Sequence, residues 1–211
     1  MSFVKTKNLD IYSLGLLDYD KAYQLQQRIH KEVVAKTRFA AVLILEHRPV
    51  ITAGRQVNDK DLLISKMHLR RKGIDYHEVE RGGLFTAHMP GQLVVYPILP
   101  LKELKIGVRR FVFLLEESIM QLLKEFGILA KRKNAYPGIW TSRGKIAFVG
   151  VRLSQKVSFH GLALNVNCDL GLFDLIVPCG IKGCQIVSLS QHLGSSLQMN
   201  YVIKLFLKIF C

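Results

Sequence analysis

Cys179 and Lys145 are the two residues whose types and settings point most directly to chemistry. Cys179 lies in a turn between a proline and a glycine, where its sulfur can be exposed and neighbouring backbone N–H groups can face a developing oxyanion. A nucleophilic cysteine also needs a nearby cation or helix N-terminus that favours its thiolate. The candidate cations are Lys145, His88 and His160, which lie in other turn-rich segments. A cysteine nucleophile is therefore a hypothesis that depends on residues distant in the sequence.

Each of these side chains also has an ordinary structural explanation. A free cysteine is most often a small buried hydrophobic residue. Lys145 precedes the apolar run 146–151, and a lysine in that position commonly extends to water. His160 lies in an apolar segment and fits a hydrogen-bonded core residue. The turn setting of Cys179 is absent from the other three cysteines, which are expected to pack or to lie at the surface: Cys168, Cys184 and Cys211.

The run Arg81-Gly82-Gly83 is a further candidate for ligand binding. Paired glycines let backbone N–H groups approach a ligand closely, and the adjacent arginine can hold an anion. Without further context, a tight loop is the favoured explanation of the run. The chain contains no GxxxxGK[ST] motif, and its glycine spacing is not that of a dinucleotide-binding fingerprint. ATP-dependent chemistry therefore loses support.

Composition predicts one globular, basic domain that spans the chain, residues 1–211. Of these 211 residues 49% are hydrophobic, and 30 Lys plus Arg against 16 Asp plus Glu give a net charge of +14. No stretch approaches the ~20 apolar residues that span a bilayer, so no membrane span is expected. The charge favours an acidic partner, which can be nucleic acid, an anionic membrane or an acidic protein. Because the basic residues are scattered, a nucleic-acid-binding protein is an alternative and not the preferred reading.

The cysteines and the N-terminal segment predict a reducing, cytoplasmic setting. The four cysteines form no CxxC pair and no zinc-type spacing, so we expect no metal site. A chain of this length does not need disulfides for stability. The first residues lack the apolar core of a secretion signal, and the early acidic residues argue against a transit peptide: Asp10, Asp18 and Asp20.

Hydrophobic periodicity predicts a single α+β domain with a mixed sheet. Apolar residues at helical spacing predict helices over residues 19–36 and 108–126, and a third from Asn200 onward. Short runs rich in β-branched residues predict buried strands over 41–45 and 92–99. Three further runs separated by turn residues predict an antiparallel meander: 139–141, 145–153 and 157–166.

Five segments, in their order along the chain, resemble the lipoyl(octanoyl) transferase family. Residues 45–55, LEHRPVITAGR, are similar to the family pattern LEHxPVxTxGR. Residues 81–98, RGGLFTAHMPGQLVVYPI, are similar to its signature RGGxxTYHGPGQLVxYPI. The segments PGIW, KIAFVGVRL and FHGLALNVNCDLGLFDLIVPCGI follow in the family's order. The resemblance covers roughly residues 45–189, which is most of the chain.

This resemblance implies a fold like the catalytic domain of biotin and lipoate protein ligases, a mixed sheet flanked by helices with a smaller second sheet. It implies transfer of an octanoyl group from acidic octanoyl-acyl carrier protein, through a thioester on Cys179, to a lysine of a lipoyl domain. The acceptors would be E2 subunits of 2-oxoacid dehydrogenases and the H protein of glycine cleavage, in the first step of endogenous protein lipoylation. No cofactor would be required, because thioester exchange is nearly neutral and amide formation runs downhill.

The resemblance also assigns roles to particular residues. Lys145 would favour the thiolate of Cys179, accept its proton and later deprotonate the target lysine. The substrate would lie along a set of glycines, apolar residues and hydrogen-bonding residues: Arg81, Gly82, Gly83, Leu84, Phe85, Thr86, Ala87, His88, Phe148, Val149, Gly150, Gly161, Leu162 and Ala163.

Three residues depart from the family pattern, and three other activities stay open. Ala87 replaces a tyrosine, Met89 replaces a glycine, and Phe148 replaces a small residue. Met89 would be unfavourable if its turn requires a positive φ. Within the same fold, the alternative is an ATP-dependent lipoate or biotin ligase, which has no need of Cys179. A thioesterase would result if water resolved the acyl-enzyme, and the nucleic-acid-binding reading remains from a different class.

Overall fold

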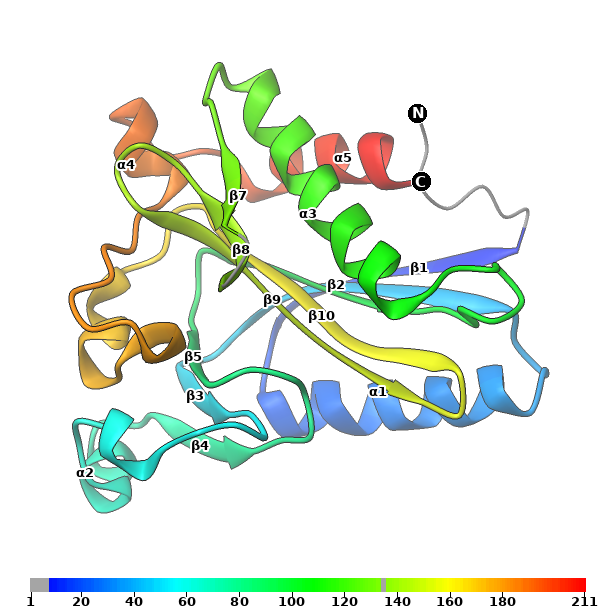
Figure 1. The fold of residues 1–211 in the computed structure, drawn as a ribbon, viewed down its shortest axis with the longest axis horizontal. Helices are drawn as coiled ribbons and strands as arrows, with labels where there is room; N and C mark the ends of the chain where they lie inside the picture. Colours follow the sequence, from blue (N-terminus) through cyan, green and yellow to red (C-terminus); the bar gives the residue numbers. More distant parts are fainter. Residues whose placement is uncertain (1–7, 134–135) are drawn as a thin grey trace.

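The structure is a computed structural model that describes residues 8–133 and 136–211, so the first seven residues of the segment considered for a targeting signal lie outside it. Its main element is a mixed seven-stranded sheet with the order β1-β2-β6-β10-β9-β8-β7 (Figure 1). Only the β1–β2 pair is parallel among these strands. The strands are β1 (Leu9–Leu17), β2 (Ala40–His47), β6 (Gln92–Ile98), β7 (Lys131–Lys133), β8 (Tyr136–Trp140), β9 (Lys145–Ser154) and β10 (Val157–Asn165).

Helices cover both faces of this sheet (Figure 1). On one face, α1 (Tyr19–Val34) packs through Ala22, Ile29 and Val33 against alternate residues of β2 and β6. On the other face, α3 (Val108–Glu125) and α5 (Met199–Phe210) form the larger hydrophobic core with the remaining alternate residues. Because neighbouring side chains of a strand point to opposite faces, the buried strands β2 and β6 serve both cores.

A three-stranded sheet stands beside the large one, with the order β4-β3-β5. Its strands are β3 (Val50–Ala53), β4 (Asp75–Glu78) and β5 (Phe85–His88). The short helix α2 (Lys66–Arg71) and the 3-10 turns Asp59–Asp61 and Leu170–Leu175 lie at this end of the molecule (Figure 1). The 3-10 turn Pro178–Gly180 and α4 (Leu189–Leu193) complete the chain between β10 and α5.

The predicted α+β class, the three long helices and the meander are confirmed. The predicted strands 41–45 and 92–99 are the centres of β2 and β6. The sequence patterns gave no strand before Tyr19, whereas β1 forms the edge of the large sheet. β1 is half exposed and its register shifts between Ser13 and Leu16, so it lacks the regular alternation that marks a strand. Within the described residues, no helix is long and apolar enough to cross a membrane.

Candidate active site

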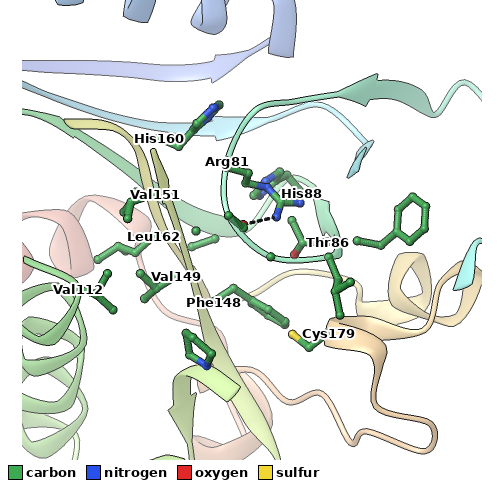
Figure 2. Close-up of a pocket in the computed structure, with 18 of the residues that line it drawn as sticks. Arg81, Thr86, His88, Val112, Phe148, Val149, Val151, His160, Leu162 and Cys179 are labelled. Carbon is green, nitrogen blue, oxygen red and sulfur yellow. Dashed lines mark hydrogen bonds between the residues drawn. The ribbon is translucent and has the colours of Figure 1, made fainter. Parts of the chain in front are cut away.

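A cavity of about 380 Å³ lies between the large sheet and the loop that leads into β5 (Figure 2). This volume falls within the range of small-molecule sites. Cys179 and Lys145 both line it. It is also lined by all of the predicted substrate residues except Ala87: Arg81, Gly82, Gly83, Leu84, Phe85, Thr86, His88, Phe148, Val149, Gly150, Gly161, Leu162 and Ala163. The structure therefore gathers residues from both halves of the chain around one space.

Lys145 and Cys179 are in direct contact. The Lys145 ammonium Nζ donates to Cys179 Sγ at 2.9 Å and to the Pro137 carbonyl at 2.7 Å. The ammonium also lies 5.2 Å from the ring centroid of Trp140 and 4.9 Å from that of Phe148. Lys145 is 1% exposed, so it does not extend to water. The ammonium and the sulfur are placed for proton transfer between them, and the positive charge favours a thiolate.

The backbone of the cysteine turn sets the direction of the thiol. Cys179 is half-buried and has a left-handed conformation with φ 57°, and Gly180 follows with φ 67°. The N–H groups of Gly180 and Ile181 donate to the carbonyls of Val177 and Pro178 at 3.1 Å. These two N–H groups are therefore engaged inside the turn and do not face the cavity, in contrast to the expected role of turn N–H groups at an oxyanion.

Arg81 forms part of a polar wall of the cavity. Its guanidinium donates to the backbone carbonyl and hydroxyl of Thr52, both at 2.9 Å, and to the Gly82 carbonyl at 3.1 Å. Burial lowers the pKa of the Arg81 guanidinium. A side chain at Gly54 would approach the Gly83 carbonyl to 2.3 Å and Arg81 Nη1 to 2.9 Å. Glycine at position 54 therefore lets the Arg81–Gly83 loop fold over β3.

The same wall contains buried, neutral histidines. His88 Nδ1 contacts Gln92 Oε1 at 2.7 Å, and Gln92 in turn donates to Asn165 Oδ1 at 2.9 Å. Burial lowers the pKa of both His88 and His160 to about 3. Among the described residues, three buried atoms of this wall have no hydrogen-bond partner: Arg81 Nε, Thr86 Oγ1 and His160 Nε2. Of the three cations considered for Cys179, the two histidines are neutral near pH 7, and Lys145 is the one that contacts the sulfur.

The opposite wall is apolar. Figure 2 shows Val112 of α3 beside Val149 and Val151 of β9 and Leu162 of β10, away from Arg81 and His88. The side chains of this wall offer no hydrogen-bonding group, so it suits a hydrocarbon chain.

The Phe148 ring takes part in both the cavity and the core. It lines the cavity between Cys179 and the apolar wall (Figure 2), and it stacks on Phe173 with ring centroids 5.0 Å apart. The ring is 6% exposed and belongs to the hydrophobic cluster below the small sheet. A role in the pocket and a role in packing therefore coexist at this residue.

The other two departures from the family pattern fit the core. Ala87 is fully buried opposite Ile51 of β3 and packs in the hydrophobic cluster of the small sheet, whereas its neighbours Thr86 and His88 line the cavity. Met89 is 4% exposed in the same cluster, and it is not among the residues with a positive φ, whereas Gly91 has φ 83°. The residue of this turn that adopts a positive φ is therefore Gly91 and not Met89.

The sequence patterns do not identify several residues that line the cavity, and they suggest His160 only as a cation near Cys179. Tyr19 starts α1 and Val112 lies one turn inside α3, where nothing in a single helix distinguishes a cavity residue from a core residue. The missed lining residues are Tyr19, Gln56, Tyr96, Val112, Tyr136, Pro137, Val151 and His160.

The remaining thiols lie outside the cavity and are less suited to react. Burial raises the pKa of Cys168 to about 12 and also raises the pKa of Cys184 and Cys211. Within the described ranges, no group of three or more His, Cys, Asp or Glu side chains is arranged to hold a metal ion. Cys179 is partly exposed, and a lysine ammonium contacts its sulfur directly.

Comparison with known proteins gives one consistent result. Residues 18–211 match the family model described as the lipoyl protein ligase A/B catalytic domain. The octanoyltransferase of Maridesulfovibrio salexigens is 35% identical over 202 residues, covering 96% of this chain and 94% of that protein. The octanoyltransferase of Caldicellulosiruptor saccharolyticus is 40% identical over 208 residues, covering 96% of this chain and 88% of that protein.

Solved structures show the same fold at low sequence identity. A lipoate-protein ligase A bound with ATP superimposes with a TM-score of 0.72 at 14% identity, covering 95% of this chain and 83% of that chain. A bipartite lipoate protein ligase studied with its E2 lipoyl domain from Thermoplasma acidophilum gives 0.67 at 12% identity, with coverage of 95% and 82%. Biotin protein ligase from Aquifex aeolicus gives 0.55 at 20% identity, with coverage of 96% and 68%. The predicted likeness to biotin and lipoate ligase catalytic domains is confirmed.

Proposed function

Since the chain belongs to the lipoyl protein ligase A/B catalytic family and, within it, is a lipoyl(octanoyl) acyltransferase, we propose that it works through a thioester on Cys179. The donor is octanoyl-acyl carrier protein, and the acceptors are lysines of E2 lipoyl domains and of the glycine cleavage H protein. The observation that carries this proposal is the 2.9 Å contact between Lys145 Nζ and Cys179 Sγ at the edge of a cavity with one apolar wall.

In the first half of the reaction, the Cys179 thiolate attacks the thioester carbonyl of the donor. A bond forms between Sγ and the carbonyl carbon, and the bond from that carbon to the carrier sulfur breaks. Lys145, which has taken the thiol proton, returns a proton to the leaving carrier thiolate. One thioester replaces another, so no ATP is consumed.

In the second half, the amine of the target lysine attacks the acyl group on Cys179. A carbon–nitrogen bond forms, the bond to Sγ breaks, and neutral Lys145 takes the proton released by the amine. The product is an amide, which is more stable than a thioester, so this step runs downhill. A group that both activates the thiol and deprotonates the amine must exchange protons readily, as a lysine does and an arginine does not.

The walls of the cavity suit the two parts of an octanoyl thioester. The apolar wall of Val112, Val149, Val151 and Leu162 would hold the hydrocarbon chain. Thr86 and His88, on the polar wall, would lie toward the reacting carbonyl. The net charge of +14 supports an acidic carrier as donor, because it steers an oppositely charged partner. The pairing of a related ligase with an E2 lipoyl domain supports the proposed acceptor.

Mass spectrometry of the intact protein after mixing with octanoyl-acyl carrier protein tests the proposal. The wild type should gain one octanoyl group on Cys179 without ATP, and Cys179→Ala should neither gain it nor transfer it. Replacement of Cys168, Cys184 or Cys211 should leave transfer largely intact, because none of these lines the cavity. Transfer by Cys179→Ala would overturn the nucleophile assignment.

The same mixture separates the competing activities. Activity from free octanoate that requires ATP would favour a ligase over a transferase. Release of octanoate with no acylated lipoyl domain would favour a thioesterase. Octanoyl-lipoyl domain formed without ATP, and only after the acyl-enzyme, is the expected result.

A further inference from the structure

One peptide unit links the catalytic lysine to helix α3. The carbonyl of Pro137 accepts from Lys145 Nζ at 2.7 Å, and the N–H of the same peptide unit, that of Gly138, donates to Glu116 Oε1 at 2.8 Å. In a trans peptide the C=O and N–H groups point in opposite directions, so a group that holds one of them fixes the other. The contacts therefore run from Glu116 through this peptide to Lys145 and on to Cys179.

Glu116 is itself held firmly. It lies on α3 and is 7% exposed, and its second oxygen accepts from Arg132 Nε at 3.1 Å. Arg132 also donates to Glu117 Oε2 at 2.6 Å and lies over the ring of Phe113. A buried carboxylate that accepts from a backbone N–H makes a strong, charge-assisted hydrogen bond and polarises the peptide toward a better carbonyl acceptor.

The lysine stem lies close against this peptide. Gly138 has φ 116°, and a side chain there would approach the Ala147 carbonyl to 2.4 Å and Lys145 Cε to 2.8 Å. The lysine stem therefore packs directly on the glycine backbone. With the carbonyl on one side and the sulfur on the other, the position of the ammonium depends on the orientation of the Pro137–Gly138 peptide.

We propose that Glu116 is a positioning residue for the acyl-transfer pair, holding the Pro137–Gly138 peptide so that its carbonyl fixes Lys145 against Cys179. This inference rests on the proposed function. In many enzymes a third group orients the base that activates the nucleophile. Here Glu116 and the Pro137–Gly138 peptide together would orient Lys145 in this way. Glu116 touches neither substrate nor reacting atoms in this arrangement.

The test compares Glu116→Ala with Glu117→Ala. Both variants remove one carboxylate from Arg132, but the Glu117 carboxylate accepts from Arg132 and Gln121 rather than from the peptide, so Glu117 serves as the matched control. Glu116→Ala should lower kcat for octanoyl transfer by about tenfold or more, with KM for the carrier substrate unchanged within about twofold. It should also move the pH profile of Cys179 alkylation by iodoacetamide to higher pH. Glu117→Ala should leave both quantities near those of the wild type.

Glu116→Gln is the conservative variant, because its amide oxygen can still accept from the Gly138 N–H. It should restore most of kcat and the alkylation profile. If Glu116→Gln behaves like Glu116→Ala, or if Glu117→Ala shows the same losses, the effect comes from the Arg132 ion pair and the proposal is overturned. If Glu116→Ala does not fold, Glu116→Asp, which is one methylene shorter and keeps the charge, takes its place beside Glu116→Gln.

Alkylation requires no octanoyl substrate, so this experiment separates the two proposals. A wild-type protein that forms no acyl-enzyme on Cys179 would overturn the proposed function. The alkylation profiles of the Glu116 variants would still show whether Glu116 positions Lys145. An unchanged profile in folded Glu116→Ala overturns the positioning role even if the acyl-enzyme forms normally.

Discussion

Acidification from pH 7.5 to 5.0 should destabilise this protein strongly, because three histidines are buried in their neutral form. Burial lowers the pKa of His47 to about 4 and those of His88 and His160 to about 3. In the unfolded chain the same residues titrate near ~6.5. The unfolded state therefore binds more protons below that pH. The stability that the neutral histidines contribute is complete above ~6.5 and is lost as the pH falls toward ~4 and then ~3.

The size of the effect follows from these pKa values. At pH 5.0 each histidine is almost fully protonated in the unfolded chain and almost neutral in the folded one, which costs about 2 kcal/mol of unfolding free energy. Three such residues cost about 6 kcal/mol, and a typical domain has only about 5–15 kcal/mol in total. Carboxylates titrate mainly below this window, so histidines dominate it.

Urea unfolding followed by circular dichroism at pH values between 7.5 and 5.0 measures this loss. Near pH 5 the free energy of unfolding should fall by about 1.4 kcal/mol per pH unit for each histidine. His160 has φ 59°, a conformation that asparagine tolerates, so His160→Asn removes one titrating group at small backbone cost. Its slope should be about one third smaller than that of the wild type. A wild-type stability that changes by less than about 1 kcal/mol over this range would refute the reasoning.

Three further predictions concern the reaction. Lys145→Ala should slow alkylation of Cys179 at neutral pH and abolish transfer, because the ammonium 2.9 Å from the sulfur favours the thiolate. Lys145→Arg should not restore transfer, since a guanidinium does not release its proton. Added salt should raise KM for octanoyl-acyl carrier protein in steady-state assays and affect a small octanoyl thioester much less, because screening weakens the encounter of a basic enzyme with an acidic carrier. Phe148→Ala should shift kcat/KM among six-, eight- and ten-carbon thioesters toward longer chains, since one methylene in an apolar pocket is worth roughly 1–3 kcal/mol. The loss of stacking on Phe173 should also lower unfolding free energy by ~3–5 kcal/mol.

Each of these predictions has an outcome that contradicts it. An unchanged pH profile of alkylation in Lys145→Ala would remove Lys145 as the electrostatic partner of Cys179. Equal salt sensitivity for the carrier-bound and the small thioester would show that the net charge does not contribute to recognition of the carrier. An unchanged ranking of chain lengths in a folded Phe148→Ala protein would reduce that residue to a packing role.

The elements predicted best are those with a clear hydrophobic pattern in their own residues. The helices α1 and α3 follow from apolar spacing, and β2 and β6 follow from unbroken apolar runs that are buried on both faces. β4, with the sequence DYHE, carries no such pattern, because it is an edge strand that is largely exposed. Its existence depends on pairing with β3, which is a tertiary contact that no local signal reports.

Sequence motifs predicted which residues form much of the site, but not the contacts between them. Cys179 and Lys145 are 34 residues apart, and their types suggested a pair, but the 2.9 Å contact depends on how the turn after β10 returns to β9. Ala87 is predicted to line the substrate site as part of a contiguous run, but it packs in the core of the small sheet, a tertiary placement that the run does not show. Glu116 lay inside an amphipathic helix, where a buried carboxylate is not distinguishable from a surface one until its partner on β8 is known.

The left-handed backbone at Cys179 lowers the stability of the fold at the position where the reaction needs a thiol. A residue with a side chain held at φ 57° raises the energy of the folded state, typically by ~1–3 kcal/mol, and glycine or asparagine would relieve much of it. Neither of those residues supplies a thiol. Selection for a more stable protein and selection for an acyl-accepting sulfur therefore act in opposite directions at this one position, and the surrounding core must offset the difference.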